Sequence, residues 1–108
     1  MARAFQVNHQ LTSQDLSVTI QDQNGLNFNP YAIFYVFYGK GDGVPYRVGL
    51  GDNQPASDTE GVFYANNKIS SSFLKGDYYC EWVIRRTDSS PFEIIARQEF
   101  TVYSENSY

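Results

Sequence analysis

The stretch Tyr31-Ala-Ile-Phe-Tyr-Val-Phe-Tyr38 decides the fold. Its eight residues are apolar or aromatic throughout, so a strand built from them is apolar on both faces. Such strands lie in the middle of a sheet, or where another subunit covers the second face. The run is far shorter than the roughly 20 apolar residues that a membrane-spanning helix needs. We therefore expect a central β-strand and no membrane association.

The segments on both sides of this stretch predict further strands. Residues 16–20 and 77–86 alternate apolar and polar side chains, with the period of two that is typical of half-buried strands. In the second of these segments, one face carries Tyr78, Cys80, Trp82 and Ile84. Shorter patterns predict strands within 3–10, 45–50, 61–65 and 92–102, the last with Ile94, Ala96, Phe100 and Val102 on one face.

Segments rich in Gly, Asn, Asp and Pro separate these strands. Turns are expected at 22–25, 39–43, 75–76 and 87–91. The longest loop is expected at 51–60, and an irregular strand or a single helical turn at 66–74. About seven short strands at this spacing are typical of an antiparallel β-sandwich. The sequence therefore predicts one domain over residues 1–108, with a short N-terminal arm (1–10) and a polar C-terminal tail (103–108).

The composition excludes several classes of protein. Nine Tyr, eight Phe and one Trp in 108 residues argue against a disordered segment and against a helical bundle, because aromatic residues favour strands. The net charge of -4 argues against nucleic-acid binding through a basic surface, and Arg85-Arg86 is the only adjacent basic pair. The first residues contain no apolar segment of the kind found in secretory signals.

Residues that could carry catalysis or bind a metal are scarce. His9 is the only histidine and Cys80 the only cysteine, so a catalytic triad, a histidine-rich metal site and an internal disulfide are not expected. The glycine loop at 39–43 leads into a strand and not into a helix, which favours a hairpin over a phosphate site. Residues 22–25 lack the following acidic ligand that a calcium loop requires. We expect no enzymatic activity, no metal and no cofactor.

The aromatic residues outnumber the positions on one inward sheet face. Aromatic side chains that escape a core are typical of the centres of protein–protein interfaces. The predicted partner-binding residues are Phe5, Val7, Tyr35, Tyr38, Phe63, Tyr79 and Tyr103, and Tyr31 is a further candidate for an outward face. Two other uses of this surplus stay open: a platform on which a sugar ring stacks, and a core that extends to both faces of the central strand.

The phrase Gly76-Asp-Tyr-Tyr-Cys80 resembles the F strand of immunoglobulin domains, in which a Tyr lies two residues before a Cys. The chain has no second cysteine, and Trp82 follows Cys80 instead of lying on an earlier strand. The resemblance therefore implies an Ig-like β-sandwich and not an antibody-type domain.

A longer pattern spans residues 15–103. Its parts are Val18-x-Ile20-x-Asp22-x-Asn24-Gly25, the strand at 31–38, Glu60-Gly-Val-Phe-Tyr-Ala65, the turn from Leu74 to Tyr78 that leads into Trp82, and Gln98-Glu-Phe-Thr-Val102. This order resembles the small Ig-like modules of tailed-bacteriophage virion proteins, both of the baseplate and of the decoration type.

The phage resemblance implies a structural or adhesive protein without catalytic residues. The expected role is an accessory subunit of the capsid, neck, tail or baseplate, located in a virion that assembles in the host cytoplasm. Its expected partners are other virion proteins, with a homo-oligomer possible and with neither nucleic acid nor membrane among them. Many copies would dock on a symmetric lattice, and the arm from Arg3 to Gln10 could add a strand to a neighbouring protein. The alternative is a carbohydrate-binding module for a cell-surface glycan, which needs exposed, coplanar rings on one sheet face or in the loops at 39–43 and 51–60.

Overall fold

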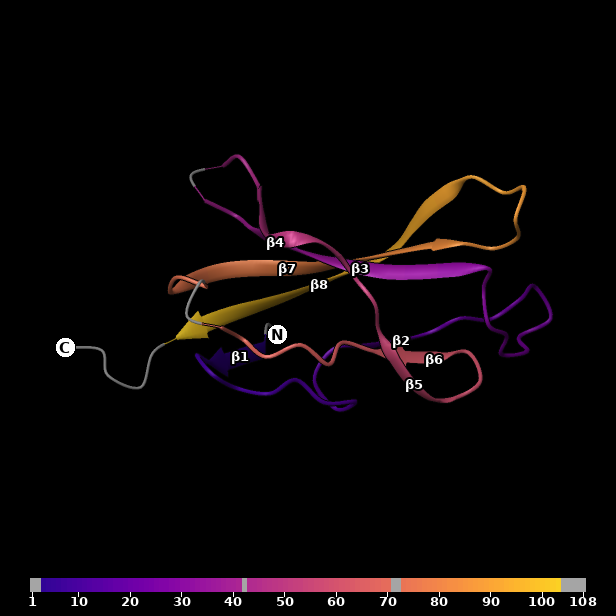
Figure 1. Ribbon diagram of the computed structural model, residues 1–108, viewed down its shortest axis with the longest axis horizontal. Helices are drawn as coiled ribbons and strands as arrows, with labels where there is room; N and C mark the ends of the chain where they lie inside the picture. The colour runs from indigo at the N-terminus through magenta and orange to yellow at the C-terminus, as the bar shows by residue number, and fades with distance from the viewer. Residues whose placement is uncertain (1–2, 42, 71–72, 104–108) are drawn as a thin grey trace.

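The computed structural model describes residues 3–41, 43–70 and 73–103 of the chain as two packed β-sheets (Figure 1). The strands are β1 (Arg3–Gln6), β2 (Ser17–Thr19), β3 (Ala32–Gly39), β4 (Tyr46–Asn53), β5 (Ala56–Thr59), β6 (Val62–Tyr64), β7 (Gly76–Arg85) and β8 (Phe92–Tyr103). Five strands form one sheet in the order β1-β8-β7-β3-β4, and three form the other in the order β2-β6-β5. The predicted all-β, Ig-like sandwich is confirmed, with eight strands.

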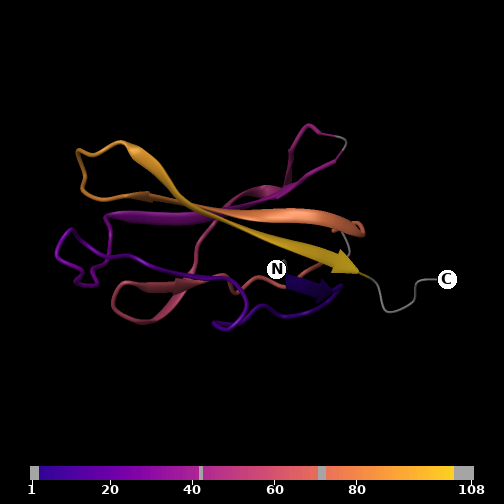
Figure 2. The same ribbon diagram turned by 180° about the vertical axis from the view of Figure 1, so that it is seen from behind.

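The N-terminal strand β1 pairs with β8 in parallel, and this is the only parallel pair among the described strands. Arg3 lies opposite Phe100 and Gln6 lies opposite Tyr103, whereas the other described strand pairs are antiparallel. Figure 2 shows β1 in indigo beside the end of β8. The first described residues of the predicted arm therefore add a strand to the sheet of their own chain. Residues 1–2 of the arm and 104–108 of the tail lie outside the described residues.

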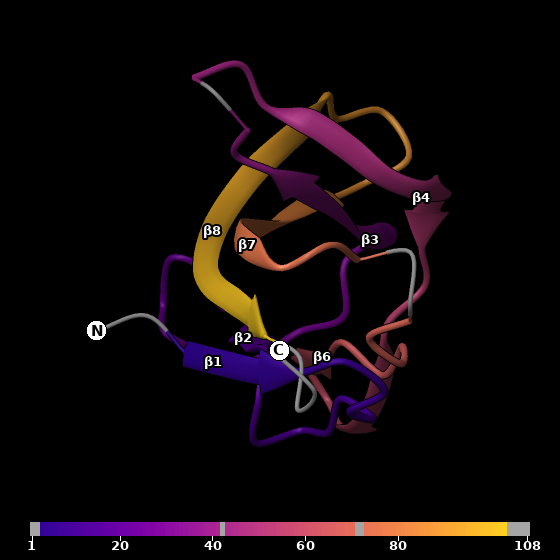
Figure 3. The ribbon, with the colours of Figure 1, turned by 90° about the vertical axis from the view of Figure 1, so that its left-hand side faces the viewer.

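The second sheet is reached through β4 and β5. Figure 3 shows the chain leaving the end of β4 and descending to the layer of β2 and β6. The sequence predicted a loop over 51–60, but β4 continues to Asn53 and β5 fills Ala56–Thr59, so this prediction is wrong. Pro55 lies in the short corner between the two strands, whereas Gly51, Asp52 and Asn53 belong to β4 itself. Polar side chains are tolerated in β5 because it is an edge strand and mostly exposed.

The core lies between the two sheets and is dominated by aromatic rings. The predicted face of β7 is confirmed, because Tyr78, Cys80, Trp82 and Ile84 are all buried. Trp82 packs against Tyr35 of β3, with ring centroids 5.0 Å apart. The Trp82 Nε1–H donates to Gln98 Oε1 at 2.9 Å, and Gln98 Nε2 donates to the Ser17 carbonyl at 2.7 Å. This relay satisfies the buried indole and joins the two sheets.

Tyr78 forms the corner that is typical of Ig-like domains. Its hydroxyl donates to the carbonyl of Leu74, four residues upstream, and thereby holds the turn that enters β7. Burial, together with a hydrogen bond and electrostatic repulsion from Tyr46, raises the pKa of Tyr78 to about 12. The hydroxyl is therefore a neutral donor at physiological pH. The Tyr-x-Cys phrase marks the same local structure in this chain as in immunoglobulins, without the disulfide.

Between β6 and β7, Lys68 forms an isolated antiparallel bridge with Gln10, which agrees with the irregular strand predicted within 66–74; residues 71–72 lie outside the described residues. Ile69 fills the core with no exposed surface. Its backbone bonds to the N-terminal segment on both sides, because Asn8 N–H donates to the Ile69 carbonyl and Ile69 N–H donates to the His9 carbonyl. The backbone groups are thus satisfied without a regular element. Among the described residues, no helix is long and apolar enough to cross a membrane.

A β-bulge in β8 changes which of its side chains face the core, so the predicted face of this strand is wrong at Ile94. Trp82 pairs with Ala96 but Val83 pairs with Ile94, so Ile95 is an extra residue. Because a strand alternates its faces, one extra residue reverses the orientation of everything beyond it. Phe100 and Val102 point into the core as predicted, whereas Ile94 lies on the opposite face and is 52% exposed. Ile95 packs against the core instead.

Asp15 fastens the segment that follows β1. His9 Nε2 lies 2.9 Å from Asp15 Oδ2, and Thr12 N–H donates to the same oxygen at 2.8 Å. Partial burial raises the pKa of the Asp15 carboxyl, but the hydrogen bonds from His9 and Thr12 outweigh it and lower the pKa below 3.8. The charged form of Asp15 therefore stabilises the fold.

Replacing Asp15 by Asn is expected to lower the free energy of unfolding by about 1–2 kcal/mol at pH 7, since a charged acceptor is lost. A lowered pKa stabilises the folded state above the unfolded value, and this contribution disappears as the pH falls through the folded value. The difference between wild type and variant should therefore shrink below about pH 4, as urea titrations at several pH values would reveal. Asp58→Asn, on exposed β5, is the control. A difference in unfolding free energy between wild type and Asp15→Asn that stays constant down to pH 3 would contradict this role of Asp15.

Candidate binding surface

The outer face of the five-stranded sheet is the surface that points away from the three-stranded sheet. Its side chains are Phe34, Val36 and Tyr38 of β3, Tyr79, Glu81, Val83 and Arg85 of β7, and Phe92, Ile94, Arg97 and Glu99 of β8. Two hairpins rise on this side, one joining β3 to β4 and the other joining β7 to β8, as Figure 1 shows at the top. Val36, Glu81 and Val83 are buried at its centre, so its accessible side chains lie toward the two hairpins.

The end near the glycine loop is aromatic and charged. The rings of Tyr38 and Tyr79 stack with centroids 5.2 Å apart and an angle of 24° between their planes. The Arg97 guanidinium lies 5.8 Å from the centre of the Tyr79 ring. Arg97 Nε donates to Glu81 Oε2 at 2.9 Å, and this hydrogen bond raises the pKa of Arg97 above its usual value. Both charges of this pair are therefore already satisfied within the chain.

A groove lies beneath the glycine loop at this end. It has a volume of about 430 Å³ and is lined by Lys40, Gly41, Gly43, Pro45, Tyr79, Arg97 and Glu99. Lys40 Nζ and Glu99 Oε2 are 3.0 Å apart across it. The loop joins β3 to β4, which confirms the predicted hairpin, although Asp42 lies outside the described residues. The groove offers hydrogen-bond donors and acceptors with balanced charge.

The opposite end of the outer face is apolar and more exposed. Phe92 and Ile94 are 56% and 52% exposed, and Tyr31, which precedes β3, is 63% exposed. The Phe92 ring meets Phe34 edge to face with centroids 5.8 Å apart. Arg85 lies beside both exposed rings, 5.7 Å from the centre of Tyr31 and 5.5 Å from that of Phe92. We call Tyr31, Phe92 and Ile94 the apolar patch, with the Arg85 guanidinium beside it.

The seven predicted partner-binding residues are distributed over the whole molecule. Tyr38 and Tyr79 come together on the outer face, and Tyr103 is exposed at the far end of β8. Val7 packs partly buried against the core. Tyr35 and Phe63 are buried in the core, so the prediction that they face outward is wrong, and Phe5 of the predicted arm is buried there as well.

The pleat of β3 explains why Tyr35 points inward. Tyr35 pairs with Trp82 on the inner face, whereas its neighbours Phe34 and Val36 belong to the outer face. The Tyr35 hydroxyl accepts a hydrogen bond from Asn66 N–H at 3.3 Å, and burial raises the pKa of this hydroxyl. An apolar strand contains no sequence signal for which of its two faces is the core, so this assignment needed the tertiary structure.

Sequence reasoning missed Arg85, Phe92 and Ile94 as surface candidates. The alternating pattern placed Ile94 in the core, because the bulge at Ile95 has no signature in the sequence. Arg85 belongs to the only adjacent basic pair, which was considered only in relation to nucleic acid. The sequence did contain one local signal, the turn predicted at 87–91, which brings Arg85 opposite Phe92 across β7 and β8 in the structure.

No group of three or more His, Cys, Asp or Glu side chains comes together in the described ranges. Burial raises the pKa of the Cys80 thiol far above its usual range, and the nearby Glu81 carboxylate raises it further. The thiol is therefore protonated at neutral pH and a poor nucleophile.

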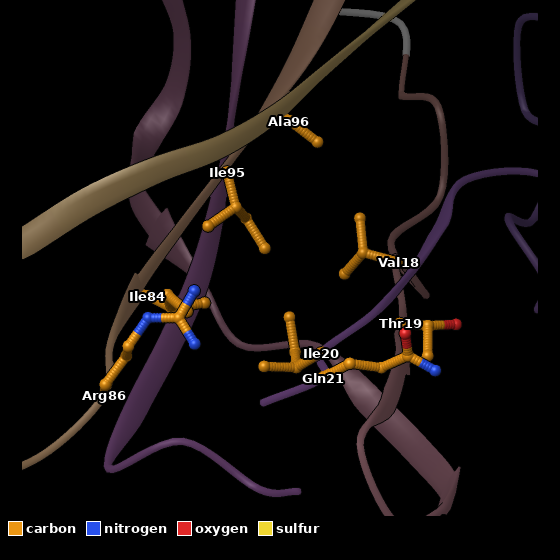
Figure 4. Close-up of a pocket in the computed structure, with 8 residues that line it drawn as sticks. All are labelled: Val18, Thr19, Ile20, Gln21, Ile84, Arg86, Ile95 and Ala96. Atoms are coloured by element: carbon orange, nitrogen blue, oxygen red, sulfur yellow. The ribbon is translucent and has the colours of Figure 1, made fainter. Parts of the chain in front are cut away.

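A second, smaller cavity opens between the two sheets. Figure 4 shows Ile95 and Ala96 of β8 on one side of this slot and Val18, with Ile20, on the other. Its volume is about 330 Å³, and Arg86 and Gln21 lie at its border. The slot lies beside the part of β8 that precedes Phe100, where no described residue of β1 pairs with β8. Its lining is mixed, because Thr19, Gln21 and Arg86 accompany the apolar side chains.

The rings that a sugar platform requires are arranged differently here. Tyr38 and Tyr79 stack against each other, and Arg97 lies against the Tyr79 ring. These contacts occupy ring faces that would otherwise receive the flat side of a pyranose. In comparisons with known proteins, no family model matches the chain, and neither a curated protein nor a solved structure shows significant similarity to it.

Proposed function

We propose that the chain is a non-enzymatic docking module that binds a partner protein through its outer face. The observation that carries this proposal is the apolar patch. Phe92 and Ile94 are each more than half exposed although they lie on a long strand of a well-packed sheet. Their burial in an interface would remove apolar surface from water at about 25 cal/mol per Å².

The composition of the outer face supports a protein partner. Tyr, Phe and Arg are enriched at the centres of interfaces, and all three occur here with their rings and guanidinium groups in contact. The charged pairs Arg97–Glu81 and Lys40–Glu99 are internal to the chain. A partner therefore need not neutralise those groups when it covers them.

The proposed setting is the virion of a tailed bacteriophage, as an accessory subunit of the capsid, neck or tail. Support for this setting comes from the motif resemblance across residues 15–103. A small module with one apolar patch binds weakly alone. Many copies on a symmetric lattice would bind firmly through avidity.

The alternative is carbohydrate binding in the groove beneath the glycine loop. The groove combines the edge of Tyr79 with Lys40, Arg97 and Glu99, which supply donors and acceptors for hydroxyl groups. Its size falls in the range of small-molecule sites. The stacked arrangement of Tyr38 and Tyr79 argues against it, because little ring face is left for a sugar.

A double substitution, Phe92→Ser with Ile94→Ser, tests the docking proposal. The affinity for virion proteins encoded beside this gene is expected to fall at least about 100-fold, since two central apolar residues of an interface commonly contribute about 2 kcal/mol each. The melting midpoint should change little, because both side chains are exposed. Titration calorimetry would give the affinity and thermal unfolding the midpoint.

Leu26→Ser is the matched control. Leu26 is 65% exposed but lies in the connection between β2 and β3 and not on the outer face. This substitution should leave binding unchanged. Binding of the wild-type chain to glycans on an array, with no retention of virion proteins, would refute the proposal and favour the alternative. Equal loss in the control and the double variant would show that another surface is used.

A further inference from the structure

Arg85 is held in a fixed position at the last residue of β7. Its Nε–H donates to the Ser90 carbonyl at 2.7 Å, and its Nη2 donates to the Asp88 carbonyl at 2.7 Å. Both acceptors belong to the turn between β7 and β8. A guanidinium that is already anchored by two hydrogen bonds loses little conformational entropy when a ligand binds.

The guanidinium of Arg85 also contacts two exposed aromatic rings. Its central carbon lies 5.7 Å from the centre of the Tyr31 ring and 5.5 Å from that of the Phe92 ring. Both distances are within the range of cation–π attraction. The rings lower the access of water to the cation, so that its charge acts in a less polar environment than free solvent.

Among the described residues, the charge of Arg85 is not neutralised by an acid, in contrast to its neighbours. Arg97 binds Glu81 at 2.9 Å, Arg86 binds Glu93 at 2.8 Å, and Lys40 binds Glu99 at 3.0 Å. In the described part of the chain, Arg85 forms hydrogen bonds to backbone carbonyls only and has no salt bridge. The neighbouring Asp88 contributes its carbonyl and not its carboxylate.

Part of the guanidinium stays available to a ligand. An arginine has five N–H groups, and the two hydrogen bonds to the turn use two of them. Nη1 makes no hydrogen bond within the described residues, and it forms a two-pronged donor with the second N–H of Nη2. This fork matches the two oxygens of a carboxylate.

We propose that Arg85 is the receptor for the carboxylate of an Asp or Glu side chain in the partner protein. This inference rests on the proposed function and names the chemistry of its partner: an acidic residue flanked by apolar residues that pack on Phe92 and Ile94. A single unpaired cation balances one carboxylate. Phosphate carries more charge than Arg85 alone would neutralise, since the adjacent Arg86 is already paired with Glu93.

The experiment selects binders from a displayed library of random twelve-residue peptides against the intact chain. The selected peptides are expected to share one Asp or Glu with apolar neighbours. One such peptide is then synthesised with its acid and with the corresponding amide, Glu→Gln or Asp→Asn. The acidic form should bind at least about tenfold more tightly, because a desolvated, two-pronged ion pair is lost in the amide.

Protein variants then identify the receptor. Arg85→Gln should lower the affinity for the acidic peptide about tenfold and leave the affinity for the amide peptide unchanged. The preference for the acid should therefore disappear. Arg85→Lys keeps the charge but loses the fork, and should retain only part of the preference. Arg86→Gln, next in sequence, is the control and should preserve it. Because the two peptides differ only in one group, their comparison holds even if Arg85→Gln disturbs the turn.

The outcomes separate this inference from the proposed function. Selected peptides that lose binding with Phe92→Ser but show no preference for acid would overturn the role of Arg85 and leave the docking face intact. Peptides that bind regardless of Phe92 and Ile94 would overturn the docking face itself. An acid preference that survives Arg85→Gln would place the receptor at another residue and refute the inference.

Discussion

The variant Tyr35→Ala is expected to lose about 3–5 kcal/mol of unfolding free energy, which is the usual effect of deleting a fully buried aromatic side chain. Tyr35 is 0% exposed and contacts the rings of both Trp82 and Phe37. The cavity left behind would remove these contacts from the centre of the core. Since 1 kcal/mol corresponds to about 4–8 °C in a domain of this size, the melting midpoint should fall by at least about 12 °C.

Tyr35→Phe is the matched control for this prediction. It keeps the ring and removes only the hydroxyl, which accepts a hydrogen bond from Asn66 N–H. The expected loss is about 1 kcal/mol, the usual net contribution of one hydrogen bond. Thermal and urea unfolding of both variants would measure the difference. A Tyr35→Ala chain that melts like wild type but fails to bind its partner would show that Tyr35 is an interface residue after all.

The second large effect is expected at Gly61, in the turn between β5 and β6. Its φ is +78°, and a Cβ added there would lie 2.9 Å from Phe28 N and 3.0 Å from Ile20 O. Both of these are backbone atoms, which cannot move aside as a flexible side chain would. Gly61 also accepts a hydrogen bond at its carbonyl from Ile20 N–H at 2.7 Å. Gly61→Ala should therefore cost about 2–4 kcal/mol, from the left-handed backbone and the overlap together.

Gly25→Ala separates the two contributions to this cost. Gly25 has the same φ of +78°, but nothing lies within 4 Å of the added Cβ. Only the backbone strain remains, so the expected loss is about 1 kcal/mol. Chemical denaturation of the two variants would test this comparison. Equal losses at Gly25 and Gly61 would contradict the close approach of Phe28 and Ile20.

The local patterns of the sequence predicted most of the elements, because each such pattern has a local physical cause. The alternation in β7 follows from the pleat, and the turn at 22–25 follows from Asn24-Gly25 and from Asp22, whose Oδ1 accepts from Asn24 N–H at 2.8 Å. Both predictions are confirmed. These features depend on residues within a few positions of one another.

The predictions that are wrong depend on contacts between distant residues. Whether Tyr35 or Phe34 faces the core is decided by the second sheet, and the bulge at Ile95 is decided by the pairing with β7. The candidate surface was therefore predicted only in part: Tyr31, Tyr38 and Tyr79 were named, while Arg85, Phe92 and Ile94 were missed. The side of a strand that faces water is a property of the whole fold.

The parallel pairing of β1 with β8 has a consequence for how the chain folds. Arg3 lies opposite Phe100, so almost the entire chain separates two residues that become neighbours. Closing such a loop has a large entropic cost before any contact compensates for it, and folding rates fall as the mean separation of contacting residues rises. The sheet can therefore be completed only after β8 is in place, and folding on the millisecond-to-second scale is expected. Until then the edge of β8 remains open to the first strand of another copy.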